Sequence, residues 1–111
     1  MLAALSVGLV LFSGCAGNAS ADTIDVTAKE MHFTPATMTV NAGRHTITVH
    51  NAGNLTHTFS LNALGREVTI RPGKTRTMSV NFESGSYRYV CRILDHEGLG
   101  MHGVLRVRAQ Q

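Results

Sequence analysis

The feature that most constrains this chain is a series of short segments in which apolar and polar residues alternate. In TIDVTA, for example, Ile24, Val26 and Ala28 fall on one face of an extended chain. Such segments recur about every ten residues, separated by turn signals such as Pro72–Gly73, and no stretch has the period of an amphipathic helix. This spacing predicts an antiparallel β-sandwich or small barrel of about eight strands. The expected strands are TIDVTA, ATMTV, HTITVHN, THTFSLN, EVTI, TRTMSVNF, YRYVC and GVLRVRA.

The N-terminal segment differs from the rest of the chain. Residues 1–14, MLAALSVGLVLFSG, carry no charge, and they end in small residues before Cys15. The stretch is too short to span a bilayer comfortably, which favours a secretory leader. LFSGC resembles the lipobox of bacterial lipoproteins, in which the cysteine is diacylated; the alternative is a leader cut near GNASA, which would discard Cys15.

These observations define the expected organisation of the chain. We expect a lipoprotein signal peptide over 1–14, a lipidated N-terminus and flexible tether over 15–22, and one domain over 23–111. The protein would then be exported and lipid-anchored, in the periplasm or at the outer face of a membrane. The 10 Lys and Arg residues exceed the 7 Asp and Glu residues, but they form no basic run, so we expect no nucleic-acid binding. The scattered arginines would suit an acidic partner: Arg66, Arg71, Arg76, Arg106 and Arg108.

A single thiol near the C-terminus points to a metal. Because Cys15 is either lipidated or removed, Cys91 has no partner in the mature domain, and an odd thiol is a liability in an oxidising compartment. The alternative is a buried, inert cysteine. In the loop CRILDHEGLGMH, however, Cys91 is followed by His96 and Met101. Thiolate, imidazole and thioether together form a soft ligand set that suits copper.

A fourth ligand would have to come from another part of the sheet. His57 is the best candidate, because it opens the strand after the turn NAGN. His45 and His50 are expected on the polar face of their strand, exposed to solvent. His32 and His102 are likewise interpreted as surface or structural histidines.

These motifs together resemble those of a known family. NAGNLTHTFSL followed by GSYRYVCRILDHEGLGMHGVLRV is similar to the cupredoxins, the blue copper proteins that include plastocyanin, azurin and auracyanin. The upstream FTPATMTVNAG is similar to the family opening, so the resemblance extends from about Ile24 to Val107. It implies a Greek-key antiparallel β-sandwich. It also implies one Cu(I)/Cu(II) ion with His57, Cys91 and His96 as strong ligands and Met101 as a weak axial ligand.

Two pairs of residues near this site differ from the residues that many members of the family have there. Thr58 and Arg92 stand where many members have Asn and Ser or Thr, and a Thr58 hydroxyl could still tie the two loops together. Leu94–Asp95 stands where many members have Pro-Gly. In the family an apolar patch surrounds the loop histidine, and three leucines could form it here: Leu55, Leu94 and Leu99.

The predicted function follows from the filled ligand set. With all four positions occupied no site remains for a substrate, so we expect a one-electron carrier rather than an enzyme. Its partners would be electron-transfer proteins such as a cytochrome, an oxidase or a reductase, and the carrier itself would be a monomer. One alternative is an extracytoplasmic protein for copper delivery or resistance. Another is a cupredoxin-like subunit of a larger respiratory complex.

Overall fold

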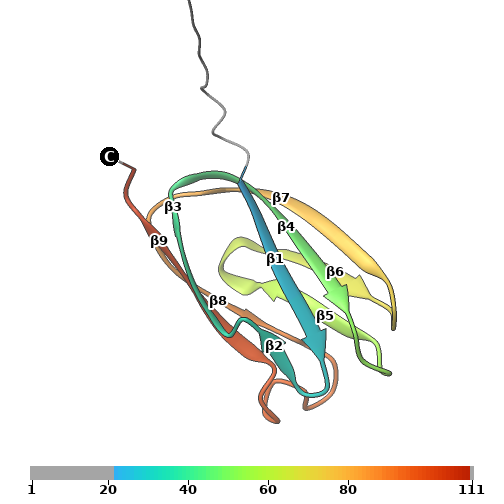
Figure 1. The fold of residues 1–111 in the computed structure, drawn as a ribbon. Helices are drawn as coiled ribbons and strands as arrows, with labels where there is room; N and C mark the ends of the chain where they lie inside the picture. Colours follow the sequence, from blue (N-terminus) through green and yellow to red (C-terminus); the bar gives the residue numbers. More distant parts are fainter. Residues whose placement is uncertain (1–21, 111) are drawn as a thin grey trace, which may run out of the picture.

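A computed structural model describes residues 22–110 of this chain as two packed β-sheets (Figure 1). The predicted leader and Cys15 lie outside the described residues. Nine strands are present in the described range: β1 (Asp22–Lys29), β2 (His32–Thr34), β3 (Thr37–Asn41), β4 (Gly43–Asn51), β5 (His57–Leu61), β6 (Arg66–Ile70), β7 (Thr75–Phe82), β8 (Gly85–Val90) and β9 (His102–Arg108). Between 22 and 110, no helix has the length and apolarity needed to cross a membrane.

The strand order confirms the predicted sandwich. One sheet has the order β2-β1-β4-β7 and the other has the order β3-β9-β8-β5-β6. Most neighbours are antiparallel, but β1 pairs with β4 in parallel and β3 pairs with β9 in parallel. The chain crosses between the sheets after β2, where Pro35 lacks the N–H that a continuing ladder would need. Strands that return after such a crossing are free to run parallel to their new neighbour.

The core lies between the sheets, where the alternating residues of each strand meet. Ile24, Val26 and Ala28 are buried in β1, as their spacing predicts. Strand β5 differs, because all five of its residues are buried. Its Phe59 and Leu61 face the core, while its polar residues are covered by neighbours: Ser60 Oγ donates a hydrogen bond to Glu67 Oε1. Full burial of β5 makes it a rigid support for the residue that begins it.

An aromatic cluster fills the core beneath the end of the sandwich that carries the predicted ligands. Phe59 and Tyr89 stack with ring centroids 5.1 Å apart, and Phe33 meets both rings edge-on. The Tyr89 hydroxyl donates a 2.6 Å hydrogen bond to the Pro35 carbonyl, and burial raises the pKa of Tyr89 to about 12. Gly103 lies directly against this ring, where a Cβ would collide with it. Phe59 lies two residues after His57 and Tyr89 two before Cys91, so this cluster supports both.

The expectation for His45 is wrong. His45 is 2% exposed, its Nε2 donates a 2.7 Å hydrogen bond to the Asn41 carbonyl, and its ring packs near Phe82. Residues two apart on a strand point to the same face, so His45 shares the core face of Ile47 and Val49. The other three histidines expected at the surface, His32, His50 and His102, are exposed as predicted.

Candidate metal centre

The four predicted ligands lie at one end of the sandwich because three strands are neighbours there. Strand β8 pairs with β5 through Ser60 and Val90, and it pairs with β9 through Val90 and His102. His57 begins β5, Cys91 follows the last residue of β8, and Met101 precedes β9. His96 lies in the connecting loop, in orange-red at the end of the sandwich in Figure 1.

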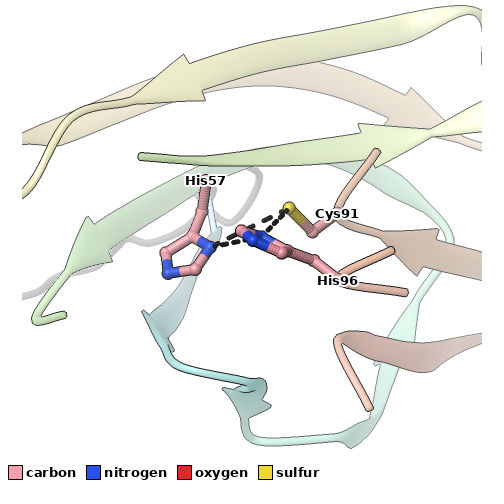
Figure 2. Close-up of side chains that lie close together, drawn as sticks. All are labelled: His57, Cys91 and His96. Carbon is pink, nitrogen blue, oxygen red and sulfur yellow. Dashed lines mark hydrogen bonds between the residues drawn. The ribbon is translucent and has the colours of Figure 1, made fainter. Parts of the chain in front are cut away.

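Three of these side chains converge on one point (Figure 2). His57 Nδ1 and His96 Nδ1 are 3.3 Å apart, and Cys91 Sγ lies 3.9 Å from the first and 3.5 Å from the second. They are the one cluster of metal-ligating His, Cys, Asp or Glu side chains found within residues 22–110. Metal–nitrogen and metal–sulfur bonds of about 2.0 to 2.3 Å place two ligands of one ion about 3 to 4 Å apart. The observed separations therefore fit a single ion.

The loop that carries His96 is closed by its own backbone. Cys91 N–H donates to the Met101 carbonyl, and Met101 N–H donates to the His96 carbonyl, both over 3.0 Å. Gly100 has a left-handed φ of 124°, and a Cβ there would lie 2.9 Å from the Met31 carbonyl oxygen. These bonds hold Cys91, His96 and Met101 next to one another.

Burial sets the electrostatics of the centre. His57, Cys91 and Met101 are fully buried and His96 is 4% exposed. In these surroundings the two ring nitrogens and the sulfur face one another and form a buried donor set for a single metal ion. An N-donor pair with sulfur suits a soft metal such as copper. The buried sulfur of Met101 adds a thioether to the same region of the core.

Thr58 joins the two segments that carry the ligands. Its backbone N–H lies 3.4 Å and its hydroxyl 3.9 Å from Cys91 Sγ, and both donate toward the sulfur. Its Oγ1 accepts a 2.7 Å hydrogen bond from the Arg92 N–H. The predicted tie through Thr58 is therefore present, with the Arg92 backbone as its partner. Both Thr58 donors lie against the atom of Cys91 that would bind a metal.

Sequence reasoning missed one residue at this centre. Glu30, in the turn after β1, lies with its Oε2 2.9 Å from His57 Nε2, although the two are 27 residues apart in the chain. Its carboxylate also accepts hydrogen bonds from the N–H groups of Asn54 and Leu55. The Asn54 N–H foremost, with the Leu55 N–H and the His57 ring, lowers the pKa of Glu30 from 4.5 to about 2. No motif pointed to Glu30, because the contact depends on how β1 lies beside β4.

Comparison with known proteins supplies the family context. The sequence model described as "Cupredoxin-like domain" matches residues 2–107. No curated protein is significantly similar in sequence.

Several solved structures are similar to this chain. Auracyanin A, a blue copper protein from Chloroflexus aurantiacus, has a TM-score of 0.69 at 21% identity, over 80% of this chain and 100% of its own. Auracyanin from Roseiflexus castenholzii has a TM-score of 0.68 at 19% identity, over 80% and 98%. A reduced amicyanin variant has a TM-score of 0.62 at 19% identity, over 84% and 86%.

Proposed function

The chain belongs to the cupredoxin-like family, and from that premise we propose that it binds one copper ion and carries single electrons between redox proteins. The observation that carries this proposal is the convergence of His57 Nδ1, His96 Nδ1 and Cys91 Sγ, three buried atoms within 4.8 Å of one another. Two imidazoles and a thiolate form the trigonal donor set of an electron-transfer copper site. The relatives named above, which include a blue copper protein, support the same reading.

His57, Cys91 and His96 would be the strong ligands of the copper ion, and Met101 would be a weak fourth ligand. Bound copper supplies a one-electron couple between Cu(I) and Cu(II). Hydrogen bonds from the loop backbone and from Thr58 would hold these ligands in place. A site that is already arranged has little to reorganise when the charge changes, which favours fast electron transfer. The filled ligand set supports a carrier rather than an enzyme.

The surface near His96 supports a docking role. Leu94 is 89% exposed and Leu99 is 57% exposed, and both belong to the loop that carries His96. Leu55, 45% exposed, lies in the turn before His57. All three belong to turns at the end of the sandwich that carries the candidate ligands, and exposed apolar side chains close to such a site can mark an interaction surface. We propose that partners such as a cytochrome, an oxidase or a reductase approach the centre over these leucines.

The proposal includes a location outside the cytoplasm. An apolar leader and a lipidated Cys15 would export the protein and anchor it to a membrane. An unpaired thiol is tolerated in an oxidising compartment when a metal occupies it. A radiolabelled-acyl or mass-spectrometric assay of wild-type protein and Cys15→Ala tests the anchor.

The burial of the ligands favours a carrier over a copper-delivery protein. Delivery requires release, and release is easier from exposed Met and His ligands than from a site whose residues are at most 4% exposed. Rapid loss of Cu(I) to a competing chelator would instead favour copper delivery.

The visible and EPR spectra of the Cu(II)-loaded protein test the proposal. We expect an intense thiolate-to-copper absorption band and narrow hyperfine splitting, both lost in Cys91→Ser. The matched control is His50→Ala, which removes an exposed histidine away from the centre and is expected to leave both signals unchanged. A pale, tetragonal spectrum that survives Cys91→Ser would mean adventitious histidine binding and would overturn the carrier function.

A further inference from the structure

The carboxylate of Glu30 contacts both a predicted ligand and the turn that delivers it. Its Oε2 lies 2.9 Å from His57 Nε2, on the side of the ring away from Cys91 and His96. The same oxygen accepts hydrogen bonds from Leu55 N–H over 2.8 Å and from Asn54 N–H over 3.0 Å. Oε1 accepts a second, 3.1 Å bond from Asn54 N–H. One side chain thus touches the His57 ring and the two residues that lead toward it.

The contact with the ring determines which nitrogen carries the proton. An ionised carboxylate only accepts hydrogen bonds, so His57 Nε2 must be the N–H donor. A neutral imidazole has one N–H and one lone pair, which leaves the lone pair on Nδ1. His57 Nδ1 is the atom turned toward His96 and Cys91 in Figure 2, while the other nitrogen points away from them. Glu30 therefore selects the form of His57 that can bind a metal at this point.

The turn is built to admit this carboxylate. A Cβ at Gly53 would collide with the Glu30 carboxylate, so only glycine permits the close approach. Asn51 holds the opposite side of the turn, with Nδ2 donating to the Leu55 carbonyl and Oδ1 accepting from Gly53 N–H, each over 2.8 Å. The Glu30 side chain is itself only 24% exposed, which limits its freedom to leave. The position of His57 is thus fixed through its ring and through its backbone.

We propose that Glu30 is a positioning residue for His57: its carboxylate holds the ring in the Nδ1-ligating tautomer and orientation, and its charge favours the oxidised ion. This inference rests on the proposed copper site. Partners that orient ligand imidazoles contribute about 10- to 100-fold to metal affinity. A negative charge beside a ligand stabilises the more positive state of the ion, so it lowers the reduction potential.

Glu30→Gln is the variant that tests the proposal, and Glu97→Gln is its matched control. Both remove one negative charge, and Glu97 is adjacent to His96, but the Glu97 carboxylate pairs with the exposed Arg88 instead of a ligand. We expect Glu30→Gln to weaken copper binding about 10- to 100-fold in a competition assay and to raise the reduction potential. Glu97→Gln is expected to leave the affinity unchanged and to move the potential less.

A second measurement needs neither a variant nor a metal. Imidazole ¹⁵N NMR of the wild-type apo-protein, recorded where imidazoles are neutral, is expected to show His57 protonated on Nε2. A proton on Nδ1 would overturn the proposal, even if Glu30→Gln did not fold. Equal affinities and potentials for Glu30→Gln and Glu97→Gln would also overturn it while the copper function stood. If the wild-type protein lacked the blue-copper spectrum, the proposed function would fall, together with the proposed effect of Glu30 on copper.

Discussion

Thr58 shows how much of this centre depends on a single small side chain. Its backbone donates to Cys91 Sγ, and its hydroxyl accepts from the Arg92 N–H while pointing toward the same sulfur. The residue is 5% exposed, so water cannot easily replace these bonds.

Thr58→Val tests that link because valine has the same shape without the hydroxyl. The Arg92 N–H would lose its partner, and we expect the free energy of unfolding of the apo-protein to fall by about 1 to 3 kcal/mol. The thiolate-to-copper band of the loaded protein should also shift. Chemical denaturation and visible spectroscopy measure the two effects. Thr69→Val, at an exposed position on β6, is the control, and equal behaviour of the two variants would contradict the role of Thr58.

Leu94 combines two local costs that packing does not explain. It is 89% exposed, and its φ of 48° lies in the left-handed region that branched apolar residues avoid. That conformation costs about 1 to 2 kcal/mol for a residue with a Cβ, and less for asparagine. An exposed residue in a strained conformation contributes little to the stability of the fold, so contact with a binding partner explains it better.

Leu94→Asn tests separately what Leu94 contributes to stability and what it contributes to docking. We expect stability to be unchanged or to rise by about 1 kcal/mol, because asparagine tolerates the left-handed conformation. Electron self-exchange between reduced and oxidised protein, measured by NMR line broadening, should become slower as the apolar surface is lost. Leu64→Asn is the control, since Leu64 is a 38% exposed leucine at the end of the short 3-10 helix η3 (Asn62–Leu64), which follows β5. Self-exchange equally slow in both variants would remove Leu94 from the docking surface.

At the scale of the elements, the centre depends on the contact between β8 and β9. Tyr89 of β8 stands opposite Gly103 of β9, and the glycine leaves room for the ring. The ring in turn stacks on Phe59 of β5. Through this cluster, the strand that ends beside Cys91 and the strand that begins at His57 are held at a fixed spacing.

Gly103→Ala is expected to disturb that spacing. The added Cβ would collide with the Tyr89 ring, and overpacking of this kind costs about 1 to 3 kcal/mol. Thermal unfolding of the apo-protein measures the loss, and a changed copper spectrum would show that it reaches Cys91. Gly98→Ala is the control, because its Cβ would make an ordinary 3.5 Å contact with the Asp95 carbonyl. A Gly103→Ala variant as stable as Gly98→Ala would contradict the packing argument.

At the scale of the whole molecule, hydrogen bonds from several parts of the fold hold the candidate ligands together. The bonds that hold the ligands come from the sheets, the closed loop and the turn after β4, and none of them requires an ion. We therefore expect metal binding to add to the stability of a chain that folds without it, unlike small domains that fold only with their metal.

Copper removal should therefore lower the melting temperature and leave the protein folded. A ligand that binds only the native state stabilises it by about 2.7 kcal/mol at a hundredfold excess over its dissociation constant. We expect calorimetry to show a cooperative transition for the apo-protein and a higher melting temperature with copper. In Cys91→Ser most of the increase should disappear. An apo-protein without a cooperative transition would contradict a preformed site.

The amino-acid sequence by itself determined the strands, most of the core and the candidate ligands. Alternation along a strand is a local property, so Ile24, Val26 and Ala28 could be placed in the core without knowing their neighbours. The spacing of Cys91, His96 and Met101 in one loop is local as well. His57 could be predicted because it begins the strand that follows the turn NAGN. His45 was misplaced although its spacing from Ile47 and Val49 already put it on the core face.

Only the tertiary structure decided how distant segments meet. The parallel pairing of β1 with β4 sets Ala28 beside Asn51, and the Ala52 N–H donates to the Ala28 carbonyl. This register brings Glu30 to the turn before His57 across 27 residues of sequence. Neither hydrophobic period nor turn chemistry encodes which strand becomes the neighbour of another, because that choice depends on the packing of both sheets at once. The candidate ligands were therefore readable from the sequence, whereas the contact of Glu30 with His57 was not.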